Sequence, residues 1–169
     1  KLEEAFSFLK DNIFFKLNCY NNIMSKLNVL VAGSTGYIGV QLIKLLINHK
    51  NIKIKYLCGN SSVGKKISIY DKTIKKKLPR ISKLDKSKMN ECDVIFTALP
   101  NGDAQKISKL LNKKNTLIDL SADFRLNDSK SYLKWYKQKH KSVNNIKKSI
   151  YSLPELNQKN IKKYQIISC

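Results

Sequence analysis

The chain has 169 residues and a formal net charge of +21, and 42% of its residues are hydrophobic. This length allows one domain with a substantial core, and the composition excludes a disordered chain. The longest apolar runs are far too short to span a bilayer, so we expect a soluble, cytoplasmic protein without membrane contact.

The basic charge first suggests a nucleic-acid partner, but the residue types argue against one. Only Arg80 and Arg125 among the 33 basic residues are arginines, and nucleic-acid sites favour the arginine fork. The lysines are spread along the chain, so we predict no nucleic-acid binding and a solvated surface that attracts anionic small molecules.

The four cysteines form no CxxC pair, and the chain has only two histidines that could bind a metal with them. This pattern predicts neither a metal site nor a disulfide framework.

The first 24 residues differ from the rest of the chain. They begin without Met and contain three acidic residues, and Met24-Ser25-Lys26 leads directly into an apolar run. We therefore interpret residues 1–24 as an extension of unknown role and residues 25–169 as one domain.

The first half of the domain starts with a buried strand over 27–32. From Gly36 the apolar period changes to that of a helix, which ends near residues 48–49. Residues 52–58 alternate as a half-buried strand. Residues 59–90 contain Gly59, Gly64, Pro79 and many lysines, which indicates loops with short strands.

The second half repeats this alternation. Its pattern predicts a buried strand over 92–100, a helix over about 103–112, a strand over 116–121, a helix over 129–140 and a last strand over 164–168. Strands that alternate with helices indicate an α/β fold with a doubly wound parallel sheet. Ligands of such sheets bind at the carboxyl ends of the strands. Three of the predicted strands end there with loop residues, at Gly33, Pro100 and Ser121.

The segment "GSTGYIG", residues 33–39, holds three of the six glycines of the chain. A strand that ends in GxxGxxG and opens a helix is typical of a Rossmann-like nucleotide-binding turn. Gly33 permits the tight turn, Gly36 lets the backbone approach a pyrophosphate, and Gly39 allows close packing of the helix. The N–H groups at the helix start would face the phosphates. We therefore predict cofactor contacts from Gly33, Ser34, Thr35, Gly36, Tyr37 and Ile38.

The residues after the second strand indicate which nucleotide binds. NAD-specific folds place an acidic residue about 20 positions after the glycine turn, to hold the ribose hydroxyls. Here no acidic residue occurs between Gly33 and Asp71. The loop instead offers hydroxyl and ammonium groups, which would hold a 2′-phosphate. We predict NADP rather than NAD, with contacts from Ser61 and Ser62 and with Lys65 and Lys66 nearby.

Three further segments carry a resemblance: "ALPNGDA" at 98–104, "LIDLSADFRL" at 117–126 and "YSLPELNQKNIK" at 151–162. Together with "GSTGYIG" and the "YLKWY" of 132–136, in this order, they closely resemble the N-acetyl-γ-glutamyl-phosphate reductases of arginine biosynthesis. The resemblance covers residues 27–169. It implies an NADPH-dependent oxidoreductase that reduces an acyl phosphate to a semialdehyde and releases phosphate.

The resemblance also implies that the catalytic residues lie outside this chain. The family's nucleophilic cysteine lies in a Pro-Gly-Cys stretch just after the strand that matches "YQIISC". Cys169 therefore corresponds to the residue ahead of Pro-Gly. The nucleophile, the family's histidine acid/base and the α+β substrate domain are then absent, and we expect the fragment to be inactive alone. We expect the full-length protein to be a homo-oligomer, because the substrate domain usually makes the family's subunit contacts.

Within the fragment, the resemblance and the strand ends together suggest further contacts. Leu99, Pro100 and Ser121 are predicted to contact the cofactor, and the substrate-binding candidates are Asn101, Arg125 and Glu155. Ordinary alternatives remain open: a strand-ending turn at 99–101, an ion pair of Arg125 with Asp123 or Glu155, and a helix cap at Glu155. We interpret His140 as structural and Trp135 and Tyr136 as packing residues.

The same residues bear on three rival functions. An epimerase or short-chain dehydrogenase shares the glycine turn but needs Lys four residues after a catalytic Tyr, and none of the eight tyrosines has it. Sister reductases that act on aminoadipyl or aspartyl phosphates stay open, the first because it shares most of these motifs. A non-enzymatic NADPH-binding module is the third alternative.

Overall fold

The computed structural model describes residues 26–152 and 161–169. Its strands are β1 (Leu27–Ala32), β2 (Ile52–Cys58), β3 (Val94–Thr97), β4 (Thr116–Asp119), β5 (Ser149–Tyr151) and β6 (Ile166–Ser168). They form one six-stranded sheet in the order β2-β1-β3-β4-β6-β5, in which every pairing is parallel. The expected parallel α/β fold is therefore confirmed.

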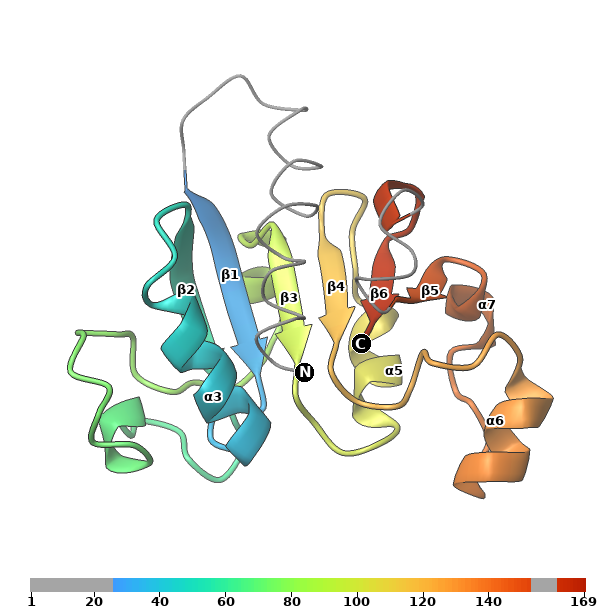
Figure 1. Ribbon diagram of the computed structural model, residues 1–169, viewed down its shortest axis with the longest axis horizontal. Coiled ribbons are helices and arrows are strands. Elements are labelled where there is room, and N and C mark those ends of the chain that lie inside the picture. The colour runs from blue at the N-terminus through green and yellow to red at the C-terminus, as the bar shows by residue number, and fades with distance from the viewer. Residues whose placement is uncertain (1–25, 153–160) are drawn as a thin grey trace.

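Helices lie on both faces of the sheet (Figure 1). They are α3 (Tyr37–Leu46), α4 (Lys86–Asn90), α5 (Asp103–Ser108), α6 (Ser129–Tyr136) and α7 (Val143–Ile146), with short 3-10 turns at η2 (Ile67–Ile69) and η3 (Ile161–Lys163). The chain passes from β1 through α3 to β2 and then returns to the other side of β1 for β3. The carboxyl ends of β1 and β3 therefore form a topological switch point, where doubly wound sheets bind their ligands.

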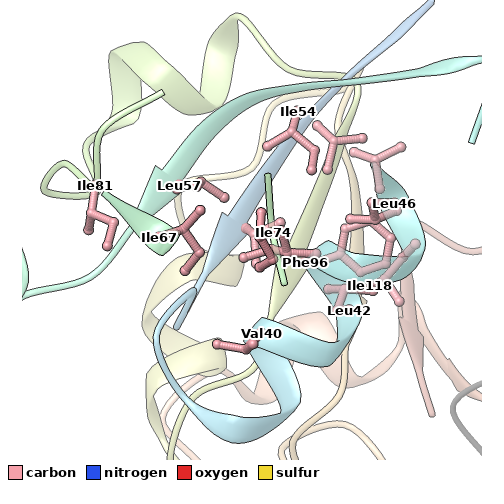
Figure 2. Packing of buried hydrophobic residues seen from close by; sticks show 14 of the residues in the cluster. Val40, Leu42, Leu46, Ile54, Leu57, Ile67, Ile74, Ile81, Phe96 and Ile118 are labelled. Carbon is pink, nitrogen blue, oxygen red and sulfur yellow. The ribbon is translucent and has the colours of Figure 1, made fainter. Parts of the chain in front are cut away.

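The core is divided between the two faces because successive strand residues point in opposite directions. Val29 and Val31 of β1 pack with α3, while Leu30 and Ala32 pack with residues of α4 and α5. Figure 2 shows the first cluster, in which Val40, Leu42 and Leu46 of α3 lie against side chains of the sheet and of the loop after β2. This loop contributes Ile67, Ile74 and Ile81, all at most 3% exposed.

Several predicted elements differ from the structure. The short strands expected within 59–90 are absent from the described chain except for an isolated bridge between Cys58 and Ser82, and the segment forms η2 and α4 instead. The helix predicted over 129–140 ends at Tyr136, because Lys137 adopts a left-handed φ of 56°. Strand β5 was not predicted, since its three residues are half-exposed and show no buried apolar run.

The predicted extension over residues 1–24 lies outside the described residues, as does the substrate-binding candidate Glu155. No helix within 26–152 or 161–169 is both long enough and apolar enough to cross a membrane.

Candidate functional site at the switch point

The glycine turn lies against the loop after β3. A Cβ atom on Gly33 would be 2.2 Å from the carbonyl oxygen of Ala98 and 3.1 Å from Leu99 Cδ2, and Gly33 has a φ of +82°. Only glycine combines this backbone angle with this closeness. The structure therefore brings together two of the predicted loops, the turn at 33–39 and the strand end at 98–101.

The other two glycines of the turn serve different ends. A Cβ atom on Gly39 would lie 2.1 Å from the carbonyl oxygen of Gly33, so α3 packs directly on the turn. A Cβ atom on Gly36 would meet no atom closer than 3.6 Å outside its chain neighbours, and its φ of −71° suits any residue. Packing thus requires glycine at 33 and 39 but not at 36. The pyrophosphate contact predicted for Gly36 stays a prediction.

Some hydroxyl and amide groups of the turn make hydrogen bonds within the protein, and others are free to bind a ligand. The carbonyl oxygen of Cys58 accepts hydrogen bonds from the Gly33 and Ser34 N–H groups and from Ser34 Oγ. Ser34 is fully buried, so its side chain joins the turn to the end of β2. Helix α3 begins at Tyr37 without a side-chain cap. Its first N–H groups have no acceptor within the helix and are available to an anion.

A pocket of about 260 Å³ opens beside this turn, between the carboxyl ends of β1, β2 and β3 and the start of α5. Cys58, Leu84, Leu99 and Ile107 line it, together with Gly33, Gly59 and Asn60. One carboxylate, that of Asp103, lines the pocket too. It forms an ion pair of 2.6 Å with Lys106.

The loop after β2 is folded against residues 80–82. Ser61, Lys65 and Lys66 are exposed, whereas Ser62 is 4% exposed and its Oγ accepts a hydrogen bond from the Tyr70 hydroxyl. Asp71, the first acidic residue after the turn, pairs with Lys44 of α3 at 3.1 Å and bonds to Thr73. These hydrogen bonds and the lysine lower the pKa of Asp71 to about 2. The Asp71 carboxylate is thus already bonded to Lys44 and Thr73 and is not available to a ligand at the end of β2.

The Asp123 carboxylate is buried and accepts several hydrogen bonds, whereas the sequence suggested it only as an ion-pair partner of Arg125. Its carboxylate accepts hydrogen bonds from the Gly102 N–H at 2.7 and 2.9 Å, from the backbone and side chain of Gln105, and from the Tyr132 hydroxyl at 2.7 Å. It therefore caps α5 from a distant loop. The signal in the sequence was Gly102, because a helix that begins with glycine has no side chain to cap itself.

A second buried carboxyl group, that of Asp119, lies at the end of β4, at the edge of the sheet formed by the carboxyl ends of the strands. Asp119 Oδ1 accepts hydrogen bonds from Thr97 Oγ1 and from the N–H and Oγ of Ser121. Burial raises the pKa of Asp119, and these hydrogen bonds partly oppose the shift. Ser121 is 9% exposed and donates its hydroxyl to Asp119, so its predicted contact with the cofactor stays a prediction.

Arg125 contacts the backbone at the end of β6. Its Nε and Nη2 donate to the carbonyl oxygen of Cys169 at 3.1 and 2.9 Å. Within the described residues it forms no ion pair, and Asp123 bonds to other groups. The substrate role predicted for Arg125 stays a prediction, as does that of the exposed Asn101.

The last three residues interpreted from the sequence differ in outcome. The packing role of Tyr136 is confirmed, because its ring packs against that of Tyr132 with the ring centroids 4.8 Å apart. His140 is 6% exposed; its Nε2 lies 2.9 Å from the Asp123 carbonyl oxygen, and its Nδ1 accepts from the Ser142 N–H, so it is a structural residue. Burial lowers its pKa. The packing role assigned to Trp135 is wrong, because this side chain is 69% exposed, whereas Tyr132, three residues before it in α6, is buried.

Comparisons with known proteins place this geometry in context. The chain is 40% identical over 147 residues to an N-acetyl-gamma-glutamyl-phosphate reductase of Ehrlichia ruminantium, which covers 85% of this chain and 42% of that protein. It is 41% identical over 140 residues to the enzyme of the same name from Thermoanaerobacter pseudethanolicus, covering 81% of this chain and 40% of that protein. The chain thus spans less than half the length of these relatives.

Two further matches extend the comparison. The chain is 38% identical over 146 residues to a Nitrosopumilus maritimus protein provisionally named LysW-L-2-aminoadipate/LysW-L-glutamate phosphate reductase, covering 85% of this chain and 42% of that protein. The aspartate semialdehyde dehydrogenase of Candida albicans, solved with NADP, superimposes with a TM-score of 0.61 at 20% identity, covering 85% of this chain and 42% of that one. At this identity the superposition supports the fold alone.

The family profile matches over most of the domain. Residues 28–164 match the semialdehyde dehydrogenase, NAD binding domain family, and this range includes the glycine turn, the pocket and Asp123. The chain therefore belongs to the semialdehyde dehydrogenase NAD-binding domain family.

Proposed function

We propose that this chain is the NADPH-binding part of an N-acetyl-γ-glutamyl-phosphate reductase, which converts the acyl phosphate to N-acetylglutamate semialdehyde. The observation that supports the proposal is that segments resembling the reductases lie together at the carboxyl ends of the strands. Asp123 of "SADFRL" bonds to Gly102 of "ALPNGDA", and Arg125 bonds to the end of β6. Segments far apart in the sequence thus form one surface beside the glycine turn.

The residues present fit a dinucleotide. The absence of a side chain at Gly36, where packing does not require glycine, and the uncapped start of α3 suit the pyrophosphate. The mainly apolar pocket beside Leu99 suits the adenosine half. When bound, the nicotinamide supplies the hydride for reduction of the acyl group.

Preference for NADPH is supported by the loop after β2. Its exposed Ser61, Lys65 and Lys66 offer hydrogen-bond donors and positive charge for a 2′-phosphate. The acidic groups nearby are already neutralised, Asp71 by Lys44 and Asp103 by Lys106.

The nucleophile of the proposed reaction is a cysteine that comes after Cys169. A thiolate is needed to attack the acyl carbon and expel phosphate. Burial raises the pKa of the Cys169 thiol to about 12, and nearby Asp119 adds to the shift. Cys169 is therefore poorly suited to be the nucleophile, while its carbonyl group, held by Arg125, fixes the path of the chain at this point.

The cofactor preference can be tested on the chain itself by fluorescence titration. NADPH should bind at least about tenfold more tightly than NADH, the equivalent of one hydrogen bond to a charged group. The double variant Lys65→Gln/Lys66→Gln should lose this preference. Lys113→Gln/Lys114→Gln removes the same charge from an exposed turn and should keep it. Equal binding of the two cofactors would overturn the NADPH assignment.

The activity requires a protein that extends past Cys169. Such a protein should oxidise NADPH when given N-acetyl-γ-glutamyl phosphate and should release one phosphate per turnover. A preference for an aminoadipyl phosphate would favour the sister reductase, which the Nitrosopumilus relative supports. NADPH binding without turnover of either substrate would favour a non-enzymatic binding module.

A further inference from the structure

A second pocket, of about 520 Å³, lies away from the cofactor rim. Its lining includes Ser108, the last residue of α5, and Lys148, which directly precedes β5. Because α5 starts at the carboxyl end of the sheet and runs back, this pocket lies at the amino ends of β5 and β6. Figure 1 shows α7, which also lines it, beside β5 and remote from α3. The pocket has the size of small-molecule sites, about 300–1,000 Å³.

The charged residues that line this pocket are all positive. Lys109, Lys141 and Lys148 line it, and no acidic residue does. None of these lysines forms an ion pair within residues 26–152 or 161–169. The carboxylates of the same ranges make hydrogen bonds or ion pairs elsewhere; they belong to Asp71, Asp85, Glu91, Asp93, Asp103, Asp119, Asp123 and Asp128. Three ammonium groups around one hollow repel each other, and a bound anion would relieve that repulsion.

The floor of the pocket is a fixed polar network. Ser108 and Ser142, 4% and 5% exposed, are joined through their hydroxyls at 2.9 Å. Ser108 Oγ donates to the Gln105 carbonyl, so Ser142 must donate to Ser108. The Asn145 amide donates to both serines at 3.0–3.1 Å. These bonds hold the end of α5 against α7, so the residues that line the pocket beside the lysines are fixed in place.

We propose that this pocket binds a small multivalent oxyanion, a molecule that carries phosphate or several carboxylate groups. The lysines supply the attraction, and the serine–asparagine floor supplies a preformed shape. The site is separate from the cofactor pocket, so it accepts its ligand while NADPH is bound.

The test uses the ¹⁵N-labelled chain saturated with NADPH at pH 7.5. Pyrophosphate and citrate are titrated separately at constant ionic strength, with calorimetry for the affinity and amide shifts for the location. We expect saturable binding of at least one anion, with shifts at Ser142, Asn144 and Asn145. The tighter of the two anions identifies the ligand as a phosphate or a polycarboxylate.

Two triple variants separate the pocket from the general charge of the protein. Lys109→Gln/Lys141→Gln/Lys148→Gln should weaken binding at least about tenfold. Lys72→Gln/Lys75→Gln/Lys77→Gln removes the same charge from exposed positions after η2 and should change it less than twofold. Equal weakening by both, no saturable binding, or shifts confined to Thr35–Ile38 would overturn the proposal. Because the shifts locate the anion, the result is independent of whether NADPH is the preferred cofactor.

Discussion

The guanidinium of Arg125 donates two hydrogen bonds to the carbonyl oxygen of Cys169, 44 positions along the chain. The Cys169 N–H in turn donates to the carbonyl oxygen of Asp119 at 2.9 Å. These contacts join the loop after β4 to the end of β6. In the proposed enzyme they position the segment that leads to the nucleophile.

Replacement of Arg125 by Lys should therefore destabilise the domain. Lysine keeps the charge but cannot make two bonds from a planar fork, so we expect a loss of about 1–2 kcal/mol in the free energy of unfolding. Urea denaturation measures it. The matched control is Arg80→Lys, because Arg80 is exposed and donates one bond, to the Gly64 carbonyl. An equal effect in both variants would show that the fork at Arg125 has no special role.

The glycine turn allows a paired test of packing against binding. Gly39→Ala forces a Cβ atom to within 2.1 Å of the Gly33 carbonyl oxygen and should cost about 3 kcal/mol of stability. Gly36→Ala places its methyl group at ordinary contact distance, 3.6 Å from the Gly33 carbonyl oxygen, and should change stability by less than about 1 kcal/mol. It should nevertheless weaken NADPH binding, since its methyl group enters the space assigned to the pyrophosphate. Unchanged NADPH affinity in Gly36→Ala would contradict that assignment.

Among the carboxylates at the carboxyl ends of the strands, Asp123 should be the one whose replacement lowers the stability most. Asp123→Asn places an amide where the Gly102 N–H, Gln105 and Tyr132 all donate. We expect a loss of about 3 kcal/mol, because a buried carboxylate with several donors is replaced by a neutral group with one acceptor oxygen. Asp128→Asn is the control, since asparagine can still accept from the Ser131 N–H at the start of α6. Thermal unfolding should show a large shift in the first variant and almost none in the second.

His140 predicts how stability depends on pH. Burial lowers its pKa in the folded state, so below the unfolded pKa of about 6.5 the unfolded chain binds more protons. The stability contributed by neutral His140 is complete above that pH and is lost as the pH falls through the folded pKa. Asp119, whose pKa is raised by burial, acts in the opposite direction, so variants must be compared with each other.

The measurement is urea unfolding at several pH values between 5 and 7.5. His140→Gln should flatten the loss of stability on acidification relative to the wild type. A slope that is identical in the wild type and His140→Gln would rule out His140 as its source.

The coding DNA after Cys169 provides the most direct test of the proposed function. We expect it to read Pro-Gly-Cys and to continue in frame, because the proposed reductase needs a cysteine nucleophile and the chain covers only 42% of the length of the Ehrlichia reductase. A stop codon there would leave the natural protein without its nucleophile and would favour a binding role.

Local sequence determined the main elements of this protein and its nucleotide-binding turn. The apolar period of 27–32 and 36–48 and the spacing of Gly33, Gly36 and Gly39 depend on neighbouring residues, so they can be interpreted from the chain alone. The same holds for the mainly lysine surface and for the absence of an acidic residue soon after β2.

Only the tertiary structure decided the strand order and the partners of the buried polar groups. Asp123 caps a helix 18–21 residues away, Arg125 holds Cys169, and Trp135 faces solvent although its helix neighbour Tyr132 is buried. No local pattern specifies such pairs, because a buried charge takes whichever donors the packed chain brings within reach.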